Sequence, residues 1–313
     1  MIPVKDGAYW LEKTLGGIAA QSLASQTEVI ILDSGSTDSS LEIAGRFGAR
    51  VEHIAPADFN HGETRNVGAR LSRGKYVVMT VQDAWTEDSY WLQKLLDGFV
   101  DGEVAGVCGS QMVPIAADIN PVAWSRPISE PRIRKVKLDD PATFEKLSPR
   151  QKKELCGWDD VNAMYHRETL LQYPFRKMMF GEDIQWAQDT LLRGGAIVYN
   201  HAARVFHYHQ HEPDYSFKRI YTECYFKYKL FGLRPETADG LMDYLRDLKI
   251  LMTISDLTIR QRLGWIPYNL RLRAAENRTV RRFNQDLDKG EDYLDRYYLS
   301  QFKTSPMAPK PKA

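Results

Sequence analysis

Cysteine is scarce in this sequence, which has three among 313 residues, at Cys108, Cys156 and Cys224. The three are far apart and odd in number, which argues against a disulfide framework and against a structural zinc site. Such a set is typical of reduced thiols, so we expect a cytoplasmic protein.

Long hydrophobic runs are missing as well. No apolar stretch approaches the roughly 18 to 20 residues that a membrane-spanning helix needs, and no signal peptide precedes the first motif. Residues 1–4 match the second half of a buried strand. This match leaves open whether the natural chain has residues upstream of Met1.

Neither sign of charge dominates, because 42 Lys and Arg stand against 41 Asp and Glu, for a formal net charge of +1. Nothing in this balance indicates a protein that wraps a nucleic acid, which would require a basic face. Hydrophobic residues make up 43% and charged residues 27% of the chain, ordinary values for a globular protein with a buried core. The length suits one large domain, with or without an extension.

A glycine-rich phosphate loop is also absent. The segment after the first expected strand is Lys5-Asp6-Gly7-Ala8. It has no Gly-x-Gly-x-x-Gly pattern, which argues against a dinucleotide dehydrogenase and against a sugar-nucleotide pyrophosphorylase. No cysteine or serine is paired with a histidine and an acid in a recognisable context, so covalent catalysis by such a nucleophile finds no support.

The first two hundred residues do contain an alternation of strand and helix patterns. Apolar, β-rich runs lie at 29–32 and 76–81, with further strand-like segments at 104–113 and 196–206, and helical patterns follow the first two runs. Runs of this kind are typical of strands buried on both faces of a sheet. The alternation predicts an α/β fold with a Rossmann-like, mostly parallel, doubly wound sheet.

Two acids follow these expected strands directly. Asp33 comes at the end of the run 29–32, and Asp83 comes after the run 76–81. Ligands of open α/β sheets bind at the carboxyl ends of the strands, so we expect both acids to line one crevice. A second interpretation stays open, in which each acid only caps its own turn.

A change of character marks the C-terminal third. Aromatic and leucine residues there recur at helical spacing, as at Leu241, Leu245, Leu248 and Leu251. We therefore expect a catalytic domain at 1–213, a C-terminal helical region at 214–300, and a disordered tail at 301–313, where Pro306, Pro309 and Pro311 lie.

The helical region is rich in arginine. It carries Trp265 and Tyr268 near the arginines 260, 262, 271, 273, 278, 281 and 282. Three interpretations are open: a solvated charged face, a module for packing and homodimerisation, or a basic and aromatic surface that rests peripherally on the inner face of the membrane.

Six fragments of the chain occur together in a known order and approximate spacing. They are Ile2-Pro3-Val4-Lys5-Asp6-Gly7, Leu32-Asp33-Ser34-Gly35-Ser36-Thr37-Asp38, Arg65-Asn66-Val67-Gly68-Ala69, Thr80-Val81-Gln82-Asp83-Ala84, Gly181-Glu182-Asp183-Ile184 and Val205-Phe206-His207-Tyr208-His209. In this combination the chain resembles the family 2 glycosyltransferases of the GT-A fold, and among them the rhamnosyltransferase-like members. The resemblance covers roughly residues 1–215.

This resemblance implies a site for the nucleotide of a dTDP- or UDP-sugar donor. Pro3 and Val4 would lie against the nucleobase, and Asp33 would accept a hydrogen bond from its imide nitrogen. Arg65 would stand near the base or the diphosphate. Asn66 and Gln82 complete the predicted nucleotide-binding set.

A divalent cation, Mg²⁺ or Mn²⁺, is implied in the same way, with Asp83 and His207 as its ligands. Asp83 matches the second acid of the Asp-x-Asp motif of the family, but Val81 stands where the first acid is expected. With one carboxylate left, we expect weak metal binding without nucleotide. The alternation of His207, His209 and His211 would turn these side chains to one side of a strand, although surface histidines at a strand end explain it equally.

Asp183 matches the general base of the family, which would take the proton of the acceptor hydroxyl. An acid in the first turn of a helix is also favoured by the helix dipole alone, and this alternative stays open. On the acceptor side we expect Trp158, Asn162, Glu182 and His209. Trp158 would either stack on a sugar ring or be an ordinary core tryptophan.

The resemblance therefore implies an inverting glycosyltransferase. Its best-matching reaction moves L-rhamnose from dTDP-L-rhamnose onto a glycan or a lipid-linked saccharide during bacterial surface polysaccharide synthesis. Two alternatives remain, a UDP-hexose transferase of the same fold and a non-catalytic nucleotide-sugar-binding subunit of a polysaccharide synthesis complex. Val81 favours the subunit, and the intact Gly181-Glu182-Asp183 speaks against it.

Overall fold

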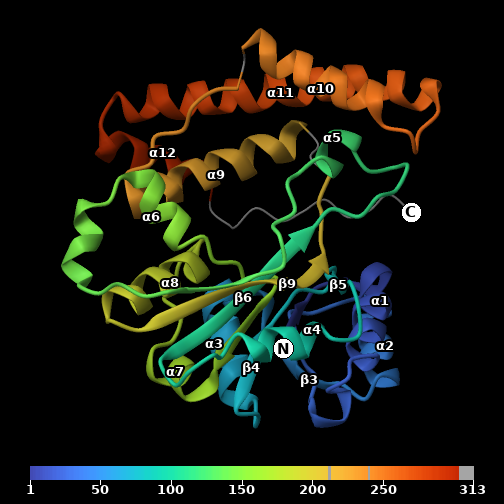
Figure 1. Cartoon of the computed structure of the whole chain (residues 1–313), viewed down its shortest axis with the longest axis vertical. Helices are drawn as coiled ribbons and strands as arrows, with labels where there is room; N and C mark the ends of the chain where they lie inside the picture. Colours follow the sequence, from blue (N-terminus) through green and yellow to red (C-terminus); the bar gives the residue numbers. More distant parts are fainter. Residues whose placement is uncertain (211–212, 239, 303–313) are drawn as a thin grey trace. The chain divides into compact units, whose positions relative to one another are not determined.

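Two compact units divide the chain in the computed structural model, which describes residues 1–210, 213–238 and 240–302. The first unit comprises Met1–Met112 and Ile128–His207, and the second comprises Val113–Pro127 and the chain from Tyr208 onward. Figure 1 colours the chain along the sequence. The boundaries at 213 and 300 stay predictions, and the tail expected from residue 301 lies outside the described residues from 303 onward.

The first sheet has three parallel strands in the order β1 (Ile2–Val4), β2 (Ile30–Asp33) and β3 (Arg50–His53). The helices α1 (Ala8–Ala19) and α2 (Ser40–Arg46) connect them along the chain. All four residues of β2 are buried, as the continuous apolar run predicted for a central strand. This part confirms the α/β class.

The second sheet is mixed. Its strands run in the order β4-β8-β6-β9-β5, and β7 pairs with β9. The bounds are β4 (Tyr76–Met79), β5 (Trp85–Thr86), β6 (Val104–Met112), β7 (Ile133–Val136), β8 (Ala163–His166) and β9 (Ala196–Phe206).

Among the described strands of this second sheet, β6 and β9 form the one parallel pair. β8 lies between β4 and β6 and runs antiparallel to both. The prediction of a mostly parallel sheet is therefore wrong for this half. The two sheets meet at Met1, whose backbone nitrogen donates to Val78 O at 2.8 Å and whose carbonyl accepts from Thr80 N at 3.3 Å.

Helices cover both sheets of the first unit. They are α3 (His61–Leu71), α4 (Trp91–Asp97), α6 (Pro149–Leu155), α7 (Arg167–Gln172) and α8 (Glu182–Leu192). Three 3₁₀ helices lie at Ala24–Gln26, Pro56–Asp58 and Pro141–Lys146. The apolar core joins α1, α4 and both sheets through buried side chains such as Leu11, Ile31, Trp91, Val107 and Val198.

The second unit is helical, as predicted for the C-terminal region. It contains α5 (Pro121–Trp124), α9 (Pro213–Phe231), α10 (Leu241–Thr253), α11 (Ile259–Leu287) and α12 (Glu291–Gln301). Aromatic rings form its centre, where Tyr225 and Tyr298 stack at 3.9 Å between ring centroids and Tyr221 donates to Asp286 at 3.1 Å. In the described parts of the chain, no helix is long and apolar enough to cross a membrane.

Candidate active site

Asp33 lies at the carboxyl end of β2, where its carboxylate closes a tight turn. It accepts hydrogen bonds from Gly35 N and Ser36 N, both at 3.0 Å, and lies 3.2 Å from His53 Nδ1. Gly35 has φ +86°, a conformation that favours glycine. Burial would raise the pKa of Asp33, but the hydrogen bonds from Ser36, Gly35 and His53 outweigh it and hold that pKa below its usual value.

The turn-capping interpretation of Asp33 is thus realised in the structure. With its side chain 1% exposed, the carboxylate is already engaged by its own turn. Its register partner in β1 is Val4, beside Pro3, so the three residues predicted to meet the nucleobase lie together at one strand end. Their contact with a nucleobase stays a prediction.

Gln82 joins the ends of β4 and β1. Its side chain accepts from Lys5 N at 2.9 Å and donates to Lys5 O at 3.3 Å, as a neighbouring strand would. A Cβ on Gly7 would lie 2.6 Å from Gln82 Oε1, so a larger residue there would displace the Gln82 side chain from its hydrogen bonds with Lys5. The Lys5 side chain also donates to Gly35 O, which brings the turns after β2 and β4 to one place, as strand-end reasoning predicted.

Asp83 and His207 face one another across the ends of β4 and β9. Asp83 Oδ1 lies 3.7 Å from His207 Nε2, and the two side chains are 18% and 13% exposed. With His209 they form a group in which one ligand atom from each residue lies within 4.8 Å of the others. One carboxylate and two imidazoles are a donor set that suits a divalent cation. His211, the third of the alternating histidines, lies outside the described residues.

A hydrogen-bonded chain that the sequence did not reveal orients His207. Gln111 Oε1 lies 2.7 Å from His207 Nδ1, and the amide nitrogen of Gln111 donates to Asp159. Because a carboxylate only accepts, Asp159 fixes the amide so that its oxygen faces the ring. Nδ1 therefore carries a proton, and the lone pair of neutral His207 is on Nε2, the atom that faces Asp83.

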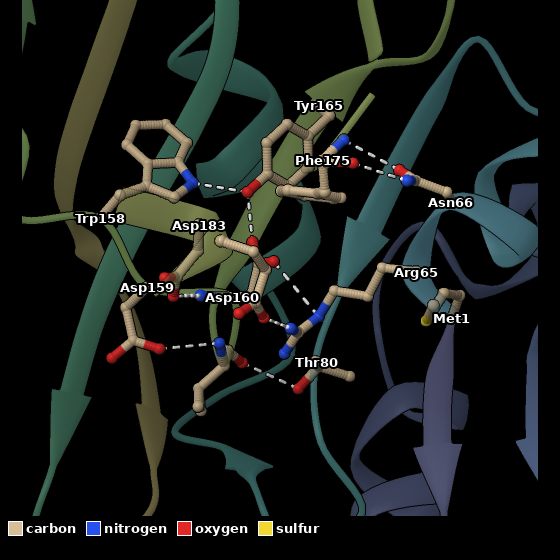
Figure 2. A network of polar contacts seen from close by, with 12 residues as sticks. Met1, Arg65, Asn66, Thr80, Trp158, Asp159, Asp160, Tyr165, Phe175 and Asp183 are labelled. Atoms are coloured by element: carbon tan, nitrogen blue, oxygen red, sulfur yellow. Dashed lines mark hydrogen bonds and ion pairs between the residues drawn. The ribbon is translucent and has the colours of Figure 1, made fainter. Parts of the chain in front are cut away.

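Asp183 lies at the start of α8, after Gly181, which has φ +79°. Beneath it is a buried network of polar side chains, shown in Figure 2. Asp160 N donates to Asp183 Oδ2 at 3.2 Å, and Asp160 itself lies 3.2 Å from the Arg65 guanidinium. Arg65 also pairs with Glu182, and Tyr165 donates to Asp160. Three carboxylates thus surround one buried cation.

This crowding decides the electrostatics of Asp183. Burial, and next the charge of Glu182, raise the pKa of Asp183 to about 6, although Arg65 and two backbone N–H groups act in the opposite direction. Burial likewise raises the pKa of Asp160 well above its usual value. A helix N-terminus alone would lower the pKa of an acid, so burial and the charge of Glu182 outweigh the helix dipole at Asp183.

Four further residues of the predicted set have structural partners. Arg65 and Glu182 are ion-paired in the interior, and their predicted contacts with nucleotide and acceptor stay predictions. The Asn66 side chain accepts from Phe175 N at 3.0 Å and donates to Phe175 O at 2.9 Å. Asn162 binds Ser110 O and Ala203 O and accepts from the indole of Trp91. These contacts account for the burial of both asparagines.

Trp158 is a core residue, so the prediction of a ring face open to a sugar is wrong. The side chain is 3% exposed, its ring packs against Tyr165, Trp186 and Tyr199, and its Nε1 donates to the Tyr165 hydroxyl at 2.6 Å. The core alternative is the one that the structure shows.

The profile of the family described as "Glycosyl transferase family 2" matches residues 1–169, more than half of the chain. The chain belongs to this family. A curated relative, "O-antigen chain rhamnosyltransferase WbaN" of Salmonella anatum, is 31% identical over 204 residues, which are 62% of this chain and 61% of that protein. The match therefore spans about three fifths of the length of this relative.

Two solved structures share the fold. The mannosyltransferase PcManGT from Pyrobaculum calidifontis, in complex with GDP-Man and Mn²⁺, has a TM-score of 0.52 at 16% identity, over 96% of this chain and 81% of that one. Glucosyl-3-phosphoglycerate synthase from Mycobacterium tuberculosis, with Mn²⁺, UDP and glucosyl-3-phosphoglycerate, has a TM-score of 0.50 at 19% identity, over 77% and 81%. The expected GT-A fold is confirmed.

Proposed function

We propose that the chain transfers a sugar from a nucleoside-diphosphate donor to a hydroxyl group of a saccharide acceptor, with inversion at the anomeric carbon. Family membership supports a transferase, and the observation that carries the mechanism is Asp183. Its carboxylate is half-buried at a helix N-terminus, and its pKa of about 6 suits a base that works near neutral pH.

In this mechanism Asp183 takes the proton of the acceptor hydroxyl as that oxygen attacks the anomeric carbon. The bond from this carbon to the diphosphate breaks at the same time, so the configuration inverts. The main chain of Asp160 and Ile184 holds the carboxylate in place through hydrogen bonds of 3.2 and 2.8 Å. Asp160 and Glu182, the carboxylates of the buried network beside Asp183, are ion-paired with Arg65, which leaves Asp183 as the base and favours this single displacement.

The leaving diphosphate needs compensation of its charge. Asp83, His207 and His209 would hold Mg²⁺ or Mn²⁺, since their ligand atoms converge within 4.8 Å. A divalent cation bound there would neutralise the charge that develops on the diphosphate. Because only one of the three ligands is a carboxylate, nucleotide and metal should bind together more tightly than either binds alone.

For the donor we propose dTDP-L-rhamnose, supported by the relative WbaN, described as an O-antigen chain rhamnosyltransferase. A glycan or lipid-linked saccharide of a bacterial surface polysaccharide would be the acceptor. A UDP-hexose donor is the alternative, supported by the UDP complex of glucosyl-3-phosphoglycerate synthase. The three cysteines are free thiols, which supports a cytoplasmic location.

A thermal-shift and turnover screen tests this proposal. The full chain is mixed with dTDP-rhamnose, UDP-glucose or GDP-mannose, each with Mn²⁺ and each with a chelator. A donor at 100 times its Kd should stabilise the folded state by about 2.7 kcal/mol. We expect the largest rise in melting temperature with dTDP-rhamnose and Mn²⁺. We also expect release of dTDP when a saccharide that can accept rhamnose is present. Binding without any turnover would instead support a non-catalytic subunit.

A further inference from the structure

Helix α10 of the second unit has its apolar face on the outside. Its buried residues are Asp247 and Leu251, and Asp247 forms an ion pair with Arg273 of α11. Large apolar side chains lie on the solvent side: Leu241 (73% exposed), Met242 (76%), Leu245 (46%), Leu248 (40%) and Met252 (45%). Leucines at 241, 245 and 248 and methionine at 252 are spaced by three or four residues, which places them on one face of the helix.

The first half of α11 repeats this pattern. Ile259, Leu263 and Leu270 are 67%, 52% and 49% exposed, and their spacing of four and seven residues again defines one helix face. The two helices pack against one another (Figure 1). We refer to these eight side chains of α10 and α11 as the exposed apolar stripes. Soluble proteins seldom leave so many large apolar residues in water on neighbouring helices.

Positive charge exceeds negative charge in the segment that carries the stripes. Residues 241–275 contain six Lys and Arg against three Asp. Two of these acids, Asp243 and Asp247, form ion pairs within the segment. Exposed cations include Lys249, Arg260 and Arg271.

The arrangement of charge selects the occupant of this surface. In a symmetric dimer through the stripes, each basic side chain near the twofold axis would lie close to the same side chain of the other copy. An anionic lipid surface can bind both kinds of side chain. Its headgroup phosphates attract the basic residues, and leucine and methionine insert at the boundary of the acyl chains. Trp265 and Tyr268, whose half-buried rings meet at 5.1 Å, are side chains of the kind enriched at such an interface.

We propose that α10 and the first half of α11 form a membrane-binding surface that lies in the headgroup region of an anionic bilayer, with the exposed apolar stripes inserted and the flanking arginines on phosphates. This goes beyond the proposed transfer reaction and does not depend on the identity of the donor. It would bring the enzyme to the surface where a lipid-linked acceptor is held.

Co-sedimentation of the full chain with vesicles tests the proposal. Vesicles of phosphatidylcholine alone are compared with vesicles that contain 30% phosphatidylglycerol, at low and high salt. We expect binding to the anionic vesicles, with a partition coefficient at least tenfold lower for neutral vesicles and also lower at high salt. Equal binding to both vesicle types, or no binding to either, would overturn it.

Two variants separate the apolar and the basic contributions. Leu245→Gln with Leu248→Gln should lower the partition coefficient at least tenfold, and Arg260→Gln with Arg271→Gln should lower it mainly at low salt. The matched control is Val100→Gln with Leu171→Gln, since these side chains of the first unit are also exposed (51% and 36%) and should leave binding unchanged. A control that weakens binding as much as the stripe variant would count against the stripes.

Light scattering of the same proteins tests a second copy as the occupant. If the wild type is a dimer, the stripe variant is a monomer and neither binds vesicles, then the stripes bind another copy of the chain and not a membrane. Circular dichroism and the donor-induced thermal shift are measured on every variant. An unchanged thermal shift shows that the first unit is intact, so a failure of the membrane proposal is distinguishable from a failure of the transferase proposal.

Discussion

Replacing Asp183 by Asn should abolish sugar transfer and yet stabilise the protein. Folding raises the pKa of Asp183 from its ordinary 3.8 to about 6. This rise in pKa corresponds to about 3 kcal/mol of stability that the ionised carboxylate costs at neutral pH. Asn has one acceptor oxygen in place of two, so it loses the hydrogen bond from Asp160 N or Ile184 N, which costs about 1 kcal/mol. The net gain is about 2 kcal/mol.

The effect should depend on pH with a defined sign. The folded carboxylate binds its proton more tightly than the unfolded one, so the contribution of Asp183 to the free energy of unfolding falls as pH rises from about 4 to about 6 and is then level. Below about pH 4 both states are protonated and the penalty disappears. Asp183→Asn should therefore be more stable than the wild type at pH 8 and slightly less stable at pH 4.

Thermal and denaturant unfolding of both proteins at pH 8, 6 and 4 measure this difference. A gain of about 2 kcal/mol corresponds to roughly 4–8 °C in Tm for a unit of this size. The matched control is Asp189→Asn on the same helix, because Asp189 lies 2.8 Å from the Arg176 guanidinium. That change should cost less than about 1 kcal/mol at every pH tested. If Asp183→Asn is the less stable protein at pH 8, or keeps near-full turnover, the reasoning is wrong.

Substitutions at Asp83, His207, Gln111 and Arg65 test other parts of the site. Asp83→Asn should raise the Kd for Mn²⁺ in the presence of nucleoside diphosphate at least tenfold, measured by electron paramagnetic resonance, and His207→Gln should do the same. Gln111→Leu leaves the ring of His207 without its orienting amide, and we expect a 10- to 100-fold loss of Mn²⁺ affinity. Gln111→Asn keeps an amide group, so a higher Mn²⁺ affinity in this variant than in Gln111→Leu would contradict a purely steric effect. Arg65→Met removes the cation that faces Glu182 and should destabilise the fold by about 3–5 kcal/mol. Unfolding in urea measures this loss of stability. The free energy of unfolding of Arg65→Lys should lie between those of the wild type and Arg65→Met.

Strand positions could be predicted where an apolar run is long enough to be recognised. The segment 196–206 is β9 from end to end, and 76–81 contains β4. β8 (Ala163–His166) is as long as β2 and β4, but it contains no β-branched residue and follows a segment of mostly polar residues at 159–162. Because β8 is the strand that runs antiparallel between β4 and β6, missing it led to the wrong sheet direction.

The sequence motifs named the residues of the candidate site, but not the residues that support them. Gln111 and Asp159 are separated by 48 positions in the sequence and meet through pairing of distant segments. Glutamine in this role has no local pattern that could indicate it. Similarly, the helical spacing of Leu241, Leu245 and Leu248 predicted a helix correctly but could not indicate which face meets solvent, and the structure exposes all three.

The buried network also explains why the proposed base is Asp183 rather than one of its neighbours. Three carboxylates share the single positive charge of Arg65, so at least one of them is held near its neutral form. Asp160 and Glu182 are 1% and 5% exposed and lie against the guanidinium. Asp183 is half-buried and contacts the network through a backbone amide, so it remains open to solvent while it feels the excess of negative charge. A carboxylate with that position can exchange a proton with an acceptor, and the stability lost to its raised pKa is the cost of keeping a base beside two other acids.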